Sequence, residues 1–152
     1  MSIDKYINAV KVAPIILESH EGMNTVIAIE VQDEVFYGIA ECHEDDVDFY
    51  SPIVGGTIAH MRAMLMALDY KLWEMEATHS ILKQTYCGIT QSYHPAVADP
   101  TGKFKLHMFR AENKVKKLRE AKRALKKELN TYIQDHSKAI ELLQRSRAKL
   151  DN

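Results

Sequence analysis

The chain has 152 residues, 46% of them apolar, and a formal net charge of -1. A chain of this length is expected to fold as a single domain over residues 1–152, with enough apolar content to bury a core. The near-zero net charge excludes a protein-wide field that would attract nucleic acid or an anionic membrane, so any such attraction must come from a local patch.

Both cysteines, Cys42 and Cys87, lie outside the spacings of redox and zinc motifs, which favours free thiols in a reduced cytoplasm. Nothing at the N-terminus resembles a signal peptide, and no apolar run approaches the ~20 residues that a transmembrane helix needs. We therefore expect a cytoplasmic protein with no membrane contact and no cofactor.

Residues 1–47 predict a small antiparallel β-sheet. The β-branched and apolar residues from Tyr6 to Glu18 predict a first strand, in which Pro14 indicates an edge position or a bulge because proline cannot donate to a strand ladder. Strand-like runs follow at 24–32 and 35–42, separated by two residues, which is a spacing typical of a hairpin.

Residues 51–87 predict a long helix that starts at Ser51-Pro52, a favourable cap and first helical residue. Apolar residues from Val54 to Tyr86 recur at alternate spacings of four and three, which is a heptad pattern. A second row of small or apolar residues follows another side of this helix: Ala59, Ala63, Met66, Tyr70, Trp73 and Ala77. Two apolar faces predict that one packs within the chain and the other against a partner chain.

Residues 88–109 are predicted to form a long loop, because Gly88 is a typical helix stop and two prolines follow. Long ordered loops are often functional, so this segment is the candidate binding loop. Residues 110–152 predict a second long helix that returns antiparallel to the first. The expected fold class is α+β, a small N-terminal antiparallel sheet followed by two long antiparallel helices that oligomerise.

The segment from Gly38 to Arg62 joins a thin strand end, an acidic turn and a helix with small residues beside an arginine. Its pattern G-x-x-x-A-x-x-R-A, residues 55–63, resembles the Thoeris anti-defence proteins of the first type. That resemblance implies a phage-encoded protein in the host cytoplasm, assembled as a homodimer or as a hexamer, a trimer of dimers. It also implies that the protein binds and sequesters cyclic nucleotide immune signals, chiefly cyclic ADP-ribose isomers such as glycocyclic ADP-ribose, without degrading them.

Two arginines are the candidate anion ligands. The resemblance implies that Arg62 binds the ligand, whereas its ordinary role would be an ion pair with Asp48 or another acid of the turn. Arg110 lies where the second helix is predicted to begin. Cations are mildly disfavoured by the dipole at that end, so an arginine there is consistent with an anionic partner.

Aromatic residues of the predicted loop are candidates for stacking on a base. We expect one of Tyr86 or Tyr93 to stack on a nucleobase, and Phe104 and Phe109 to anchor the loop. Asp99 is a further ligand candidate as an acceptor for an amino or hydroxyl group, although Asp-Pro-Thr-Gly is also ordinary turn chemistry.

Two other functions and a metal site are the alternatives to this interpretation. The acidic run 41–48 with His43 matches no calcium or zinc spacing, so no metal is expected. Residues 114–127 carry eight basic residues, which favours a nucleic-acid-binding helix as the second hypothesis, although the neutral overall charge makes nucleic acid an unexpected partner. No nucleophile motif or phosphate loop is present, so an enzyme is not expected and a cyclic nucleotide hydrolase comes third.

Overall fold

The computed structural model describes residues 1–150, apart from the side chains of Asp45 and Val47. Its first element is the helix α1 (Ile3–Lys11), whose N-cap Ser2 accepts a hydrogen bond from a backbone amide of the first turn. Three of its residues, Ile3, Tyr6 and Val10, are buried at helical spacing. The predicted strand from Tyr6 to Glu18 is therefore wrong in its first half. The β-branched residues favour a strand only weakly, and burial of the apolar face of an amphipathic helix outweighs that preference.

The sheet has three antiparallel strands in the order β1 (Ile15–Glu21), β2 (Asn24–Val31) and β3 (Glu34–Glu41). The bulge expected near Pro14 is confirmed, because the register between β1 and β2 shifts between Ile15 and Leu17. The second hairpin turns at Gln32 and Asp33, which have φ values of 57° and 65°. Two positive φ angles in a two-residue turn match the right-handed twist of the paired strands.

The helical hairpin differs from the prediction at its tip. A short 3-10 helix, η1 (Glu44–Phe49), leads into α2 (Pro52–Ser92), and α3 (Pro95–Ala98) precedes α4 (Lys103–Leu150). Gly88 lies inside α2, so the predicted long loop at 88–109 is wrong. One helical glycine costs only about 1 kcal/mol, whereas Pro95 excludes helical geometry for the residue before it and so marks the true end.

The start of α4 has an equally local cause. Both carboxylate oxygens of Asp99 accept backbone amides, from Phe104 at 3.2 Å and from Lys105 at 3.0 Å, so they cap the helix seven residues before the predicted position. The described part of α4 ends at Leu150, and the last two residues of the predicted second helix lie outside the described residues. The tip is therefore a tight helical turn in place of an open loop.

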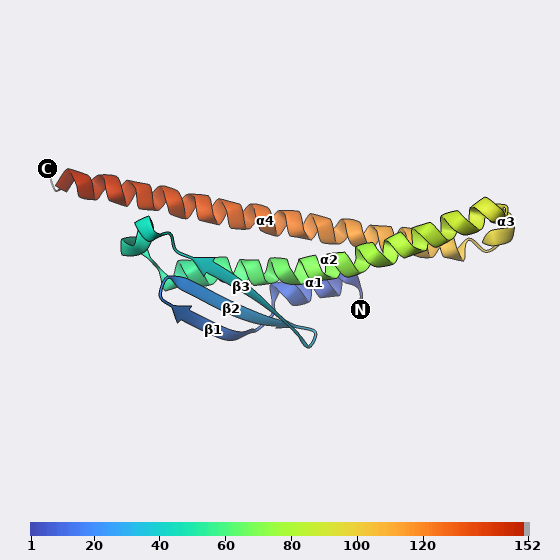
Figure 1. Cartoon of the computed structure of the whole chain (residues 1–152), viewed down its shortest axis with the longest axis horizontal. Helices are drawn as coiled ribbons and strands as arrows, with labels where there is room; N and C mark the ends of the chain where they lie inside the picture. Colours follow the sequence, from blue (N-terminus) through green and yellow to red (C-terminus); the bar gives the residue numbers. More distant parts are fainter. Residues whose placement is uncertain (151–152) are drawn as a thin grey trace.

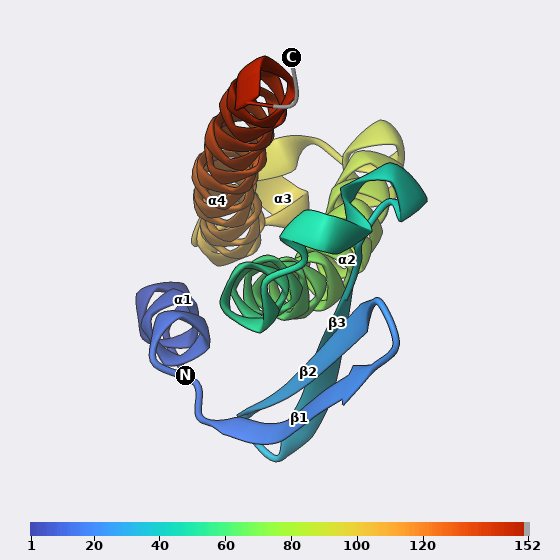
Figure 2. The same ribbon diagram turned by 90° about the vertical axis from the view of Figure 1, so that its left-hand side faces the viewer.

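The elements are arranged in layers, as Figures 1 and 2 show. Helix α2 lies on one face of the sheet, chiefly over β2 and β3, and α4 returns antiparallel along α2. Helix α1 lies beside α2 on one flank, between the sheet layer and α4 (Figure 2). The tip of the hairpin projects well beyond the sheet (Figure 1). The α+β fold class, with a small N-terminal sheet followed by long helices, is confirmed.

The core lies where α2 crosses the sheet. Three fully buried alanines, Ala59, Ala63 and Ala67, allow the helix to approach the strands closely. At the closest point a Cβ atom added to Gly38 would lie 2.0 Å from the carbonyl oxygen of Ala59. The small residues that the sequence places in this row therefore set the distance between helix and sheet.

Tyr6 fastens α1 to α2, and we expect its removal to change stability in a pH-dependent way. Its hydroxyl donates to the Ala67 carbonyl at 3.0 Å, and burial, together with Glu34 and Glu74, raises its pKa to about 12. Because the folded-state pKa exceeds the ordinary value near 10, this contribution is complete below about pH 10 and is lost as the pH rises toward 12. Tyr6→Phe should cost about 0.5–1.5 kcal/mol at pH 7 and flatten the alkaline loss.

Urea unfolding followed by circular dichroism between pH 7 and pH 12 measures both effects. Tyr37→Phe is the matched control, because the Tyr37 side chain is exposed on the outer face of the sheet. An alkaline slope as steep in Tyr6→Phe as in the wild type would contradict the assignment.

Candidate functional site

Arg62 lies on α2 beside the β3 strand. Its Nη1 donates to the Ile39 carbonyl of β3, and the side chain is exposed. Asp48, its expected ordinary partner, instead pairs with Arg147 at 3.4 Å. Among the described side chains Arg62 makes no ion pair with a carboxylate, so a strand carbonyl positions its guanidinium and its other N–H groups remain accessible to an anion.

The other candidate ligands lie near the tip of the hairpin, and two of them are already engaged. The ring of Tyr86 stacks on Phe104 with centroids 5.7 Å apart, and the carboxylate of Asp99 caps α4. Tyr93 caps the end of α2 and its side chain is 62% exposed. Of the two tyrosines, Tyr93 therefore presents the more accessible aromatic surface.

Arg110 is exposed near the tip but is not at a helix start. It lies two turns inside α4, because that helix begins at Lys103. The prediction that Arg110 lies beside unpaired backbone amides is therefore wrong, because only the first turn of a helix has such amides. Its exposed guanidinium still adds a cation to the tip.

The structure does not bring these candidates together within one chain. Arg62 and Tyr86 are separated by 24 residues of continuous helix, which corresponds to about 36 Å at 1.5 Å per residue. Tyr93, Asp99 and Arg110 lie beyond Tyr86 or beside it near the tip. A site containing both Arg62 and a tip residue therefore requires two chains.

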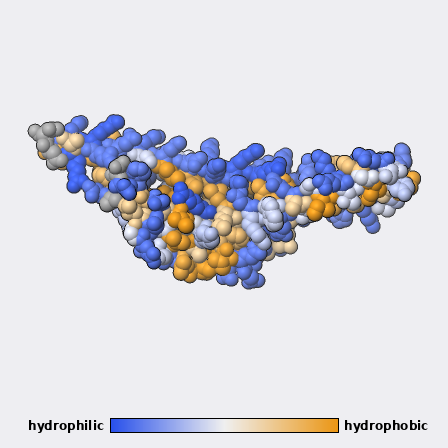
Figure 3. All heavy atoms as spheres, in the orientation of Figure 1, coloured by the Kyte–Doolittle hydropathy of each residue, from blue (hydrophilic) through white to orange (hydrophobic). Residues whose placement is uncertain are grey.

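The second apolar row of α2 continues past the sheet and is uncovered there. Tyr70 is partly supported, with its ring 5.6 Å from that of Phe36 and its hydroxyl donating to Glu34 at 3.0 Å. Trp73, one turn further, is 69% exposed. Figure 3 shows hydrophobic residues gathered below α4, whose outer surface is hydrophilic. The row thus includes a large aromatic side chain that is exposed beyond the sheet.

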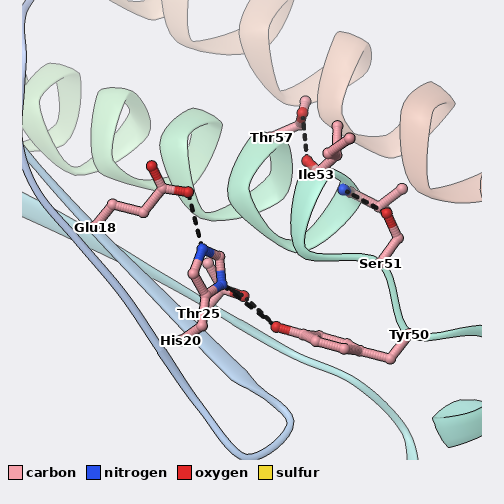
Figure 4. Close-up of polar contacts among 8 residues, drawn as sticks. Glu18, His20, Thr25, Tyr50, Ser51, Ile53 and Thr57 are labelled. Atoms are coloured by element: carbon pink, nitrogen blue, oxygen red, sulfur yellow. Dashed lines mark hydrogen bonds and ion pairs between the residues drawn. The ribbon is translucent and has the colours of Figure 1, made fainter.

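A chain of polar contacts joins the first hairpin to the start of α2 (Figure 4). The Glu18 carboxylate lies 2.9 Å from His20 Nε2, and His20 Nδ1 lies 3.1 Å from the Thr25 hydroxyl. Thr25 in turn lies 2.9 Å from the Tyr50 hydroxyl, just before the Ser51 cap. This carboxylate–imidazole–hydroxyl order occurs in nucleophilic catalysis, but Thr25 is 0% exposed, so a substrate has no access to it.

The network positions Tyr50 on the wall of a small cleft. The cleft has a volume of about 190 Å³. It lies between the end of β3, the 3-10 helix η1, the first turns of α2, and residues 133–140 of α4. Cys42 lines it, and burial, with a smaller contribution from Asp46, raises the pKa of this thiol. A raised pKa keeps the thiol protonated at neutral pH and makes it a poor nucleophile.

A wider groove of about 520 Å³ follows the opposite flank of α2. Met61 and Met64 form part of its apolar lining. His60 lines this groove as a half-buried residue; its Nε2 atom is buried without a hydrogen-bond partner, and burial lowers the pKa of the imidazole. This imidazole is therefore neutral at pH 7. Among the side chains that the structure describes, no group of three or more histidine, cysteine, aspartate or glutamate residues is arranged to hold a metal ion.

The eight basic residues of 114–127 on α4 divide into two sets. Lys117 pairs with Asp4 at 2.8 Å, Arg119 with Glu76 at 2.7 Å, and Lys122 with Asp69. The remaining five have no carboxylate partner within the described part of the chain: Lys114, Lys116, Arg123, Lys126 and Lys127. The first set holds α4 against α1 and α2, whereas the second is a solvated basic surface.

Sequence reasoning missed both the polar network and the cleft. The network had a readable signal, because Glu18 and His20 are two residues apart and so lie on one face of a strand. The cleft had none, since α4 closes it with residues nearly a hundred positions from the β3 end.

Comparison with known proteins adds no relative to this description: no family model, curated protein or solved structure matches the chain. The only membrane-related finding concerns the helices. None within residues 1–150 is sufficiently long and apolar to cross a bilayer.

Proposed function

We propose that this protein binds cyclic nucleotide signals of bacterial immunity, chiefly cyclic ADP-ribose isomers, and sequesters them unchanged in the cytoplasm of a phage-infected host. The observation that carries the proposal is Arg62, an exposed guanidinium held by the Ile39 carbonyl with no carboxylate partner in the described chain. The pattern around it, residues 55–63, is the part of the sequence that resembles the Thoeris anti-defence proteins.

Binding of this kind needs no chemistry from the protein. Arg62 makes charge-assisted hydrogen bonds to a phosphate, and the surrounding surface supplies contact area. A ligand of about 35 heavy atoms at about -0.3 kcal/mol per atom gives roughly -10 kcal/mol, which corresponds to tens of nanomolar. An abundant protein with that affinity removes a signal from its receptor by mass action.

The site is completed by a second copy of the chain. Arg62 of one protomer lies 24 residues before Tyr86, near the tip of the same chain, which is about 36 Å along the helix. Arg110 and an aromatic residue therefore reach the ligand only from the other protomer, in a homodimer or a trimer of dimers. Tyr93 is the favoured aromatic because Tyr86 is stacked within its own chain and Asp99 caps a helix.

The exposed row on α2 is the surface through which we expect the copies to associate. Trp73→Glu should convert the oligomer to a 17.4 kDa monomer, because burying a carboxylate in an apolar interface carries a large desolvation cost. Light scattering at micromolar concentration measures the mass. Folding should be unchanged, since the side chain is exposed within the protomer.

Ile53→Glu is the matched control for Trp73→Glu. Ile53 is also exposed on α2 but lies on the other flank, beside the wider groove. This variant should keep the wild-type mass. A wild-type monomer, or an unchanged mass in Trp73→Glu, contradicts association through this row.

The proposed activity is tested by depletion and release. The protein is incubated with glycocyclic ADP-ribose or another cyclic ADP-ribose isomer, the free ligand is measured, and the protein is then denatured by heat. Depletion followed by recovery of the intact ligand is the expected result. A chemically altered product would identify the third candidate, a hydrolase, and the absence of any depletion would reject both.

Nucleic-acid binding is the second candidate, and the five unpaired basic residues of α4 favour it. Phosphate neutralisation releases counterions, so affinity for duplex DNA would fall steeply with salt. Reversing the charges of Lys116, Arg123 and Lys127 tests this surface without breaking the ion pairs that hold α4. A steep salt slope that is lost in this variant, with no binding of cyclic nucleotides, would replace the first proposal.

A further inference from the structure

The small cleft at the start of α2 has the size and walls of a site for one ring system. Its volume of about 190 Å³ is below the range of about 300–1,000 Å³ for whole drug-sized ligands. Apolar side chains enclose it on two sides, with Phe49 and Ile58 from the η1–α2 region and Ile133 and Ile140 from α4. A flat, largely apolar group is therefore the shape that fits.

The polar lining selects the chemistry of that group. Glu41 and Asp46 contribute carboxylates, while no lysine or arginine is among the described residues that line the cleft. A phosphate inside it would face these two negative charges without a compensating cation. A ring that carries an amino group instead gives a carboxylate the N–H donor that it accepts. On the α4 side His136 and Ser137 supply groups that can donate to ring nitrogens.

We propose that this cleft binds an aminopurine ring, with Asp46 accepting from the exocyclic amino group and His136 or Ser137 donating to a ring nitrogen. Within the proposed function, on which this assignment rests, the ring is the adenine of the cyclic nucleotide. Ile58 on the cleft wall lies one helical turn before Arg62, about 6 Å along the axis. One face of α2 therefore presents, one helical turn apart, the cleft for the base and the Arg62 side chain for the phosphate of the same ligand.

The division of labour between two copies follows from this placement. The base and one phosphate lie on the first protomer, and the tip of the second protomer covers the remaining part of the ligand with Arg110 and Tyr93. The cleft also gives the Glu18–His20–Thr25–Tyr50 network a role in binding, because the network fixes Tyr50, which lines the cleft. Its contribution is to position the wall, not to react.

The test compares adenosine with inosine, which carries a carbonyl group in place of the amino group. Titration of the full chain by NMR should show adenosine binding, with shifts confined to residues 40–58 and 133–140, and at least tenfold weaker binding of inosine. Ser137→Phe fills the cleft from an exposed helix position and should weaken adenosine binding tenfold or more. Lys138→Phe, the neighbouring exposed position outside the lining, should bind as the wild type does.

Asp46→Asn is a smaller change that keeps the volume of the side chain, and it should remove most of the preference for adenosine over inosine. Thermal melts of each variant confirm folding. Equal binding of the two nucleosides, undiminished binding in Ser137→Phe, or no adenosine binding at millimolar concentration would overturn the assignment.

Depletion of a cyclic ADP-ribose isomer separates this inference from the proposed function. If the wild type and Ser137→Phe deplete the ligand equally, the base lies elsewhere and sequestration stands. If the wild type depletes no cyclic nucleotide but binds adenosine, and Ser137→Phe abolishes the adenosine binding, the cleft assignment stands and sequestration fails.

Discussion

Gly38→Ala is expected to destabilise the protein by about 3 kcal/mol or more, at the upper end of the costs of overpacking. The added Cβ would lie 2.0 Å from the Ala59 carbonyl oxygen and 2.5 Å from the Ala63 nitrogen. Both are backbone atoms of α2, so no side-chain rotation relieves the clash. The helix must instead move away from β3, which opens the alanine row of the core.

Gly88→Ala is the matched control for Gly38→Ala. Gly88 is also within a regular element, but nothing lies within 4 Å of its added Cβ. Alanine there should stabilise α2 by about 0.5–1 kcal/mol, because glycine is the poorer helix former. Urea unfolding of both variants measures the difference. Wild-type stability in Gly38→Ala would mean that α2 does not rest on β3.

Arg62→Ala is expected to reduce affinity for a cyclic ADP-ribose isomer ten- to a hundredfold while leaving the fold nearly intact. The lost charge-assisted hydrogen bonds to a phosphate correspond to about 1.5–3 kcal/mol. In contrast, an exposed arginine contributes only about 0–1 kcal/mol to folding. Arg62→Lys should recover part of the affinity, because an ammonium cannot reproduce the planar guanidinium.

The measurement for Arg62 is ligand titration together with urea unfolding and light scattering. Arg145→Ala, a change at an exposed arginine near the end of α4, should leave all three unchanged. If Arg62→Ala instead dissociates the oligomer and leaves the affinity of each folded molecule unchanged, Arg62 is a structural residue. The resemblance to the anti-defence proteins would then fail at its best-supported position.

The sheet and long helices could be predicted because their signals are local and repeated. Strands β2 and β3 are short runs rich in β-branched, aromatic and other apolar residues, and α2 keeps its apolar spacing over many turns. Helix α1 was missed because its nine residues contain only three buried positions, set among β-branched neighbours. Its burial depends on α2 and α4, which are distant in the sequence.

The structure of the tip differs from the prediction because the prediction treated single residues such as Gly88 as decisive for where a helix ends. Gly88 weakens a helix by about 1 kcal/mol, which the neighbouring turns tolerate. Asp99, considered as a ligand, is the residue that starts α4 through its two amide contacts. The candidate site could likewise be predicted only in part. The sequence identified Arg62, but the Ile39 carbonyl that holds it became apparent only once α2 was placed on β3.

The length of α4 between its ion pairs and the cleft is itself a constraint. Three of the ion pairs of this helix are made by Lys117, Arg119 and Lys122, whereas the cleft is closed by residues from Ile133 onward. An α-helix rotates by about 100° and rises by about 1.5 Å for each residue. Inserting a single residue between the two regions would turn the residues that close the cleft toward solvent and displace the Arg147–Asp48 pair, while the pairs of Lys117, Arg119 and Lys122 stay intact. The number of residues in α4 thus fixes both the axial position and the rotation of the residues that close the cleft. Insertions and deletions in α4 should therefore be tolerated far less than substitutions of most of its exposed side chains.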